Sequence, residues 1–142
     1  MNRSQLTDGD VTEPRSLDDL IARGLFEIVD DDYRRVEAKL LGLVQSQRSI
    51  APEVFQHLID AGGKRIRPIV HCLAAGASGY KGDDHILIAA VSEMIHSATL
   101  FHDDVIDEGA VRRGRLAAHK IWGNQNVVLV GDFVFARAFT VM

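Results

Sequence analysis

The chain has 142 residues, enough for one ordinary domain with a single core if it folds alone. Its formal net charge of −4, from 20 acidic and 16 basic residues, gives no global reason to expect nucleic-acid binding, so any recognition of phosphate has to be local. The single cysteine, Cys72, excludes an intrachain disulfide and a multi-cysteine zinc site, and it is compatible with a reducing cytoplasm. Because its neighbours are apolar, we expect Cys72 to be a buried structural thiol.

The N-terminal segment, residues 1–15, lacks the apolar core of a signal peptide and predicts a disordered leader. Residues 16–142 then form the folded part. No apolar run approaches the ~18 residues of a membrane span. We therefore expect a cytoplasmic protein with no membrane span and with no nucleic acid as a partner.

Helical spacing dominates from Ser16 onward, while strand alternation is nearly absent, which predicts an all-α fold. Apolar residues recur at intervals of three and four through 17–44. Ser16, followed by acidic residues, suits a helix start. This segment is either one long helix or two, with Gly24 or the Asp30–Asp32 run as the weak point.

Prolines and aspartates mark the next three helices. Pro52 opens a short helix that ends at the glycines of AGGK. Pro68 opens a second helix, which is small and apolar on most faces and is therefore expected to be buried. Asp83 and Asp84 can cap a third helix over 85–104.

The last segment, residues 124–142, is helical in pattern but apolar nearly all round. A glycine-bounded stretch before it, 109–114, indicates a loop. A helix with apolar residues on every side needs partners on every side, and the preceding helices supply about one. The sequence therefore looks cut at this point, or completed by another chain.

An acidic cluster, HDDVIDE at 102–108, follows the third of these helical patterns directly. Asp103 and Asp107 are four residues apart, so on a helix they share a face and repel each other unless a cation lies between them. Carboxylates without cysteine favour Mg²⁺ over Ca²⁺, and Mg²⁺ commonly shares its ligand shell with a phosphate substrate. Taken alone, such a cluster is more often a solvated acidic helix end.

The same helical face carries His96 two turns before these carboxylates, where its ring can donate to an anion held near a metal. Ser92, Thr99 and Leu100 share that face. A lone histidine in such a place is more often a satisfied core residue.

Two basic clusters accompany the acidic one. GGKRIRP, at 62–68, combines two glycines, which free the backbone, with three cations, Lys64, Arg65 and Arg67. This combination suits a diphosphate. RRGR, at 112–115, is the second. Each cluster by itself is typical of a solvated basic turn. Together with the carboxylates, they indicate two phosphorylated substrates, one of them bound through a metal.

Three motifs thus stand in order along the chain: GGKRIRP at 62–68, HDDVIDE at 102–108 with RRG at 112–114, and GNQNVVLVGDFVFARAF at 123–139. Together they resemble the all-trans polyprenyl diphosphate synthases, the head-to-tail isoprenyl transferases. The resemblance covers roughly residues 16–142. It implies an all-α fold that is the N-terminal half of an isoprenoid-synthase-type helical bundle.

The resemblance also implies an activity, the Mg²⁺-dependent condensation of isopentenyl diphosphate with an allylic diphosphate, farnesyl or geranyl, to a long-chain polyprenyl diphosphate. It implies an isopentenyl diphosphate site formed by Lys64, Arg67, His96 and Arg113. Arg112 resembles the residue that holds the allylic diphosphate, and Asp103 and Asp107 resemble the Mg²⁺ ligands.

Product length is implied at two further positions. In this family, bulky residues at the fourth and fifth positions before the first aspartate close the product tunnel. Those positions hold Thr99 and Ala98. Because both are small, the resemblance implies a long-chain product.

The family's members run to about twice this length and carry a second aspartate-rich motif in their C-terminal half, which this sequence does not contain. We therefore expect a truncated half that is inactive alone, from a family of homodimers. The alternative is a non-catalytic diphosphate-binding subunit that acts by pairing with another chain. A terpene cyclase shares the acidic motif, but the two basic motifs disfavour it.

Overall fold

The computed structural model describes residues 17–47 and 49–142, with residues 17–22 described by their backbone alone. These ranges form six helices and one short hairpin: α1 (Leu17–Leu43), α2 (Ala51–Asp60), α3 (Ile66–Ala77), α4 (Asp84–Ile106), β1 (Val111–Arg112), β2 (Arg115–Leu116), α5 (Ala118–Trp122) and α6 (Asn124–Val141). The predicted all-α fold is confirmed. The expected leader at 1–15 and the helix start at Ser16 lie outside the described residues.

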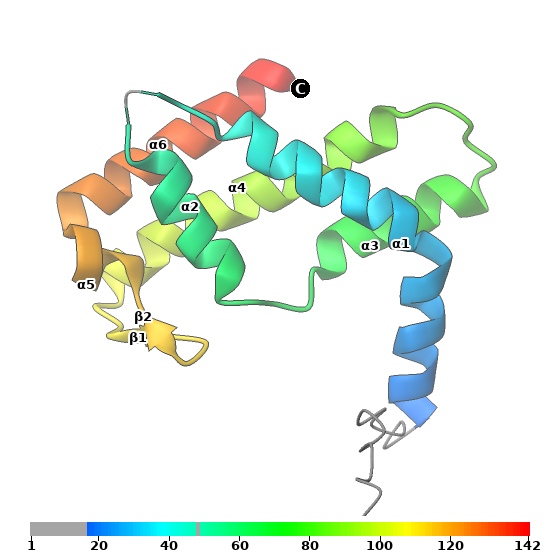
Figure 1. Ribbon diagram of the computed structural model, residues 1–142, viewed down its shortest axis with the longest axis horizontal. Helices are drawn as coiled ribbons and strands as arrows, with labels where there is room; N and C mark the ends of the chain where they lie inside the picture. The colour runs from blue at the N-terminus through cyan, green and yellow to red at the C-terminus, as the bar shows by residue number, and fades with distance from the viewer. Residues whose placement is uncertain (1–16, 48) are drawn as a thin grey trace, which may run out of the picture.

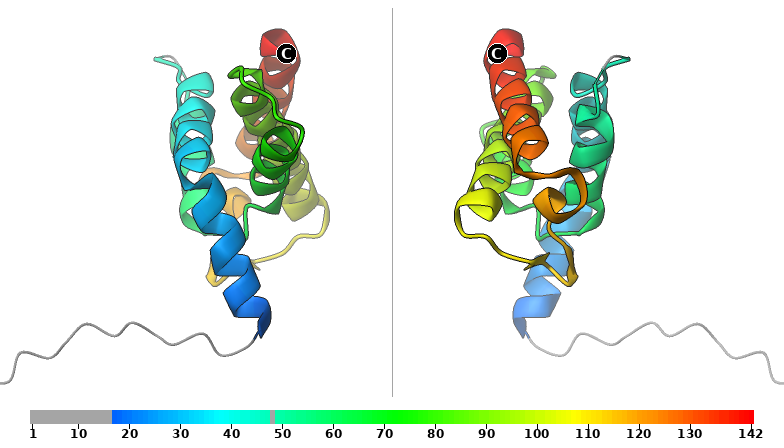
Figure 2. Two further views of the ribbon diagram at one scale, coloured as in Figure 1. Left: turned by 90° about the vertical axis from the view of Figure 1, so that its right-hand side faces the viewer. Right: turned by 90° about the vertical axis from the view of Figure 1, so that its left-hand side faces the viewer.

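The helices form two layers around one core. Figure 2 shows α1 and α2 on one side and α3, α4 and α6 on the other. Helix α4 runs through the middle of the molecule and contacts α1, α3, α5 and α6 (Figure 1). A two-layer packing of this kind buries the apolar stripe of each helix against its neighbours.

Helix α1 settles the choice between one helix and two. It is continuous from Leu17 to Leu43, although it bends part-way along (Figure 1). Its buried side chains, Val29, Val36 and Leu40, follow helical spacing and belong to the core. The long pattern in the sequence therefore describes one helix that follows the core.

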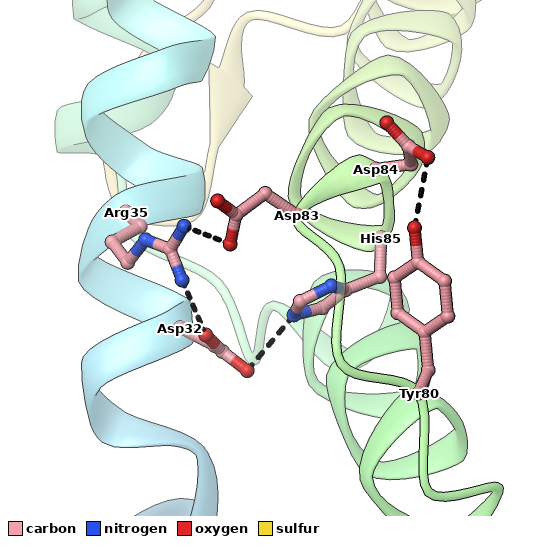
Figure 3. A network of polar contacts seen from close by, with 6 residues as sticks. All are labelled: Asp32, Arg35, Tyr80, Asp83, Asp84 and His85. Atoms are coloured by element: carbon pink, nitrogen blue, oxygen red, sulfur yellow. Dashed lines mark hydrogen bonds and ion pairs between the residues drawn. The ribbon is translucent and has the colours of Figure 1, made fainter.

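A polar network joins α1 to the start of α4 (Figure 3). The Arg35 guanidinium donates to Asp83 and, over 3.1 Å, to Asp32 Oδ1. The other oxygen of Asp32 lies 2.9 Å from Nε2 of His85. These contacts fix the entry of α4 against the middle of α1 across 48 to 53 residues of sequence.

The same network corrects the predicted helix cap. Asp83 occupies the position before α4 but makes no side-chain capping bond. Asp84 is the first residue of the helix, and its Oδ2 accepts a hydrogen bond of 2.8 Å from the Tyr80 hydroxyl. Both carboxylates are thus occupied by tertiary or loop partners rather than by the backbone of the first turn.

Helix α3 differs from its prediction in two ways. It begins at Ile66, so Pro68 is its third residue; proline is tolerated there because the first-turn N–H groups have no partner within the helix. Only Pro68 and Cys72 are buried in it, while Val70 is 53% exposed, so the expectation of burial on most faces is wrong. Cys72 is buried as predicted, and burial raises the pKa of its thiol.

The hairpin and α5 were not predicted. Strands β1 and β2 are antiparallel, have two residues each and pair Arg112 with Arg115, within and beyond the stretch assigned to a loop. Helix α5 has five residues. Elements this short carry no readable period of hydrophobicity.

Helix α6 packs one face on α4 through buried residues at three- and four-residue spacing: Val127, Val130, Val134 and Ala138. Gly131 allows close approach, since a Cβ there would lie 2.3 Å from Nε2 of His102 on α4. Its other face exposes Leu129, Phe135 and Phe139, so the described part of the chain supplies a partner on one side only. No helix in that part is long and apolar enough to cross a membrane.

Candidate functional site

A cavity of about 350 Å³, called here the basic pocket, lies where the α2–α3 loop, α4 and the hairpin turn meet. Its lining consists of Gly63, Lys64, Arg65, Ile66, Arg67, Glu93, His96 and Arg113. The fold thus brings together all four residues expected at the isopentenyl diphosphate site, from three segments far apart in sequence. Lys64, Arg67 and Arg113 carry permanent positive charges. The carboxylate in the same lining, that of Glu93, already has Arg65 as its partner.

The glycines of GGKRIRP shape the wall of the basic pocket. Gly62 and Gly63 have φ angles of +76° and +150°, which residues with a side chain rarely adopt. Gly63 also lies directly against the Arg113 guanidinium, because a Cβ at this position would be 2.1 Å from Arg113 Nη1. The motif and the hairpin are therefore in contact through a glycine that leaves room for an arginine.

The three cations of GGKRIRP do not play one role. The Arg65 guanidinium donates to Glu93 Oε1 over 3.0 Å and to the carbonyl oxygen of Ile59 over 3.1 Å. Lys64 and Arg67 form no side-chain ion pair with the described residues, and both are exposed. Only two of the three cations predicted to face a diphosphate are therefore available to one.

His96 lines both the basic pocket and a second hollow, which Arg67 and Thr99 also line. Burial lowers the pKa of its imidazole, and the positive charges of Arg67, Arg113 and Arg112 lower it further, while Glu93 acts in the opposite direction. A lowered pKa favours the neutral form of the ring at neutral pH. One of its nitrogens can donate to an anion, and the ring can take up a proton when an anion arrives.

The acidic motif divides between solvent and the protein. Asp103 and Asp107 are exposed, at the end of α4 and just beyond it. Asp104 is buried, and both of its oxygens accept from Arg112 Nε over 2.7 Å, with Arg112 Nη2 2.5 Å from Oδ1. This ion pair raises the pKa of the Arg112 guanidinium. Arg112 therefore lies on the acidic side of the hairpin rather than in the basic pocket.

Asp103 and Asp107 fit Mg²⁺ only as a partial site. The described residues contain no group of three or more His, Cys, Asp or Glu side chains placed to hold a metal ion. Two exposed carboxylates one helical turn apart nevertheless suit this ion, which usually takes one or two protein carboxylates and completes its shell with water and substrate phosphate.

The hairpin is fixed to α2 as well as to α4. Nε2 of His57 lies 2.8 Å from the Leu116 carbonyl oxygen, and Arg115 is 3.9 Å from Asp60. Arg112 and Arg113 are consecutive, yet the first turns to α4 and the second to the basic pocket. The short hairpin thus directs Arg112 toward α4 and Arg113 toward the basic pocket.

The two positions associated with product length have different surroundings. Ala98 is 1% exposed and belongs to the hydrophobic core. Thr99 is exposed and lines the second hollow, about 450 Å³, which shares Arg67 and His96 with the basic pocket. Of the pair, Thr99 alone reaches a space that a ligand can enter.

A family model described as polyprenyl synthetase matches residues 48–142, about two thirds of the chain, which include all of the candidate site residues. The chain belongs to the polyprenyl synthetase family.

The relatives of this polyprenyl synthetase sequence are considerably longer. It is 45% identical over 116 residues to octaprenyl diphosphate synthase of Escherichia coli K12, covering 82% of this chain and 36% of that protein. It superimposes with a TM-score of 0.83 and 45% identity on a decaprenyl diphosphate synthase from Rhodobacter capsulatus, covering 85% of this chain and 38% of the other. A polyprenyl synthase from Caulobacter crescentus, solved with calcium and isoprenyl diphosphate, gives 0.82 and 45%, covering 85% and 37%. The chain spans a little over a third of the length of these relatives.

The structural relatives confirm the expected fold class, the helical fold of isoprenyl synthases.

Two residues that shape the site, Glu93 and Asp104, were missed as partners of arginines. A signal was present, because both fall on the core side of α4, in line with Ser97 and Phe101, and an acidic residue on a core face implies a buried partner. The sequence could not tell which arginine would be that partner.

The contact between Gly63 and Arg113 can be tested with two alanine variants. Gly63→Ala and Gly62→Ala should each lower the free energy of unfolding by about 1 kcal/mol or more, because both positions have positive φ. Only Gly63→Ala should also shift the ¹⁵N resonance of Arg113 Nε, since a Cβ at Gly62 meets open space. An unchanged Arg113 resonance in Gly63→Ala would contradict the contact.

Proposed function

We propose that this chain carries the diphosphate-binding part of a Mg²⁺-dependent trans-prenyltransferase that makes long-chain polyprenyl diphosphates. The observation that supports this most is the basic pocket, in which Lys64, Arg67, His96 and Arg113 converge from three separate segments. Convergence of this kind is not expected of a solvated basic turn. It matches the charge and the fork geometry that a diphosphate needs.

In this proposal the basic pocket holds isopentenyl diphosphate. Arg67 and Arg113 supply paired N–H donors, and Lys64 supplies a mobile point charge. His96 donates a further hydrogen bond from the helix side. With its head group fixed by four residues, the substrate's alkene is held in one place, and positioning of this kind is a large part of what such an enzyme contributes.

The acidic side of the hairpin takes the allylic diphosphate. Asp103 and Asp107 would hold Mg²⁺, which, when bound, neutralises the leaving diphosphate and so favours ionisation of its C–O bond. Asp104 turns Arg112 by binding Nε and Nη2, which leaves Nη1 without a partner among the described residues. Arg112 can therefore donate to the same leaving group while its own position stays fixed.

In the condensation, the C–O bond of the allylic diphosphate breaks first, which gives inorganic diphosphate and an allylic cation. The alkene of isopentenyl diphosphate then attacks this cation, one C–C bond forms, and the resulting cation loses a proton to the diphosphate, which restores a double bond. Thr99 and Ala98 are both small, which supports an extended product, with Thr99 beside the hollow. Since the chain covers only 36% and 38% of the length of two such relatives, we propose that these 142 residues bind diphosphate but do not complete a turnover.

A second candidate is a diphosphate-binding subunit that acts by pairing with another chain. It is favoured by the apolar side chains that α6 exposes, Leu129, Phe135 and Phe139. A homodimer that covers this face is compatible with either candidate. The two differ in whether the chain itself contributes to turnover.

Binding and turnover are tested with one set of proteins. Calorimetry should show that inorganic diphosphate binds the chain, and that Lys64→Ala or Arg67→Ala weakens binding about ten-fold or more, because each removes a charge-assisted hydrogen bond. Lys39→Ala, an exposed cation on α1, should have no effect. Labelled isopentenyl diphosphate with farnesyl diphosphate and Mg²⁺ should give no product.

Equal affinity in wild type and Arg67→Ala would contradict the proposed site. Turnover by the chain alone would contradict the proposal that these 142 residues do not complete a turnover.

Diphosphate binding should be coupled to protonation of His96. Burial and neighbouring cations hold the pKa of His96 below its ordinary value in the free pocket; a bound anion raises that pKa, so the ring takes up a proton. Affinity should therefore increase as the pH falls toward 6. Calorimetry in two buffers of different ionisation enthalpy measures the proton uptake, and His96→Gln corrects for titration of diphosphate itself. Equal uptake in both proteins would contradict the coupling.

Pairing through α6 predicts a dimer in sedimentation equilibrium, with twice the mass of 15.6 kDa. Phe139→Asp should shift the chain to monomer, because it puts a charge into a buried apolar contact. Ile28→Asp, at an even more exposed apolar residue on α1, is the control and should leave the dimer intact. A wild-type monomer throughout the micromolar range would exclude the interface.

A further inference from the structure

Arg65 lies between two exposed cations and is itself almost entirely buried. Its side chain is 10% exposed, and that of its partner Glu93 is 5% exposed. Lys64 and Arg67, on either side in the same motif, are exposed and lack ion-pair partners among the described residues. Arg65 therefore differs in environment from the neighbours with which it shares a motif.

The backbone at Arg65 has a conformation that needs external support. Its φ of 46° and ψ of 36° place it in the left-handed region, which is costly for a residue with a side chain. This residue also occupies the position directly before α3. The strained conformation turns the chain from the two glycines into the helix, and thereby sets the directions of Lys64 and Arg67.

The contacts of Arg65 supply this support from several elements. Its guanidinium reaches the carbonyl oxygen of Ile59 at the end of α2 and the carboxylate of Glu93 in the middle of α4. The charge of Arg65 also acts on Tyr33 of α1. Burial and the hydrogen bond to Glu37 raise the pKa of Tyr33 to about 12, whereas Arg65 lowers that pKa. The side chain thus connects the loop to both α2 and α4.

We propose that Arg65 and Glu93 are positioning residues: their buried ion pair fixes the GGKRIRP loop so that Lys64 and Arg67 converge with His96 and Arg113 on one diphosphate. The inference rests on the proposed function of the basic pocket. In it, Arg65 does not touch the ligand. Its charge is matched by Glu93, and the charge that attracts the anion comes from its neighbours.

The alternative, in which Arg65 binds the anion directly, predicts the opposite sign at Glu93. Glu93 is the one carboxylate in the pocket lining, and its Oε2 has no hydrogen-bond partner among the described residues. If charge alone decided affinity, removing this carboxylate would free Arg65 and tighten anion binding. If positioning decides, removing it loosens the loop and weakens binding.

The experiment measures inorganic diphosphate affinity by calorimetry for wild type, Glu93→Gln and Arg65→Lys, well below the unfolding temperature of each protein. Glu93→Gln keeps the shape and should weaken binding about ten-fold, because small misplacement of binding groups is costly. Arg65→Lys keeps the charge and should also weaken binding about ten-fold, since one ammonium cannot reproduce the fork to Glu93 and Ile59. Amide hydrogen exchange at residues 62–66 should accelerate in both variants without ligand.

Two controls separate positioning from general stability. Val36→Ala removes buried volume from α1, away from the pocket lining, and should lower the unfolding temperature without changing affinity. Arg34→Lys makes the same chemical change as Arg65→Lys at an exposed residue and should be silent.

The outcomes distinguish this inference from the proposed function. Unchanged or tighter binding by Glu93→Gln, with diphosphate binding to wild type and weakened binding to Arg67→Ala, would overturn the positioning role and leave the pocket's function standing. Wild-type affinity in Arg65→Lys would also overturn it. If wild type itself does not bind diphosphate, both the proposed function and the inference fail.

Discussion

Helix α4 has to serve the core and the site at once, and the arrangement of the whole molecule follows from how its faces are divided. It packs against α1, α3, α5 and α6, and its buried side chains run along most of its length. That packing fixes the rotation of α4, so His96 and Thr99 face the hollows while Asp103 faces solvent. At about 1.5 Å per residue, His96 and Asp103 are on the order of 10 Å apart along the axis, room for two neighbouring diphosphates.

In both basic motifs, one arginine is paired with a buried carboxylate of α4 and the other cations are not. In GGKRIRP, Arg65 is paired with a buried carboxylate of α4, Glu93; beside β1, Arg112 is paired with another, Asp104. The remaining cations of each motif have no such partner among the described residues. An arginine paired with a buried carboxylate is held in one geometry, because breaking the pair leaves a buried charge. Each motif therefore contains its own anchor beside the residues that it presents.

The parts of this arrangement that the sequence predicted are those with a local signal. Helical spacing predicted α1, α2, α4 and α6, and the resemblance grouped the four residues that the structure brings into the basic pocket. What it missed depends on partners distant in sequence. Asp83 looks like a helix cap until Arg35 is placed opposite it, and RRG looks like a loop until the hairpin pairs. Nothing in a local window distinguishes Arg65 from Lys64, because burial and an α4 carboxylate make the difference.

The charge collected in the basic pocket has a consequence for stability. Lys64, Arg67 and Arg113 repel one another across a cavity in which the one carboxylate among the described residues, that of Glu93, is already paired with Arg65. The free chain must carry this repulsion together with the strained backbone at Arg65, so part of its folding free energy is used to hold cations close together. An anion that enters the pocket relieves the repulsion and binds only the folded state, so occupancy and stability are linked. Backbone strain and uncompensated positive charge gathered in one pocket are features of a preorganised anion site.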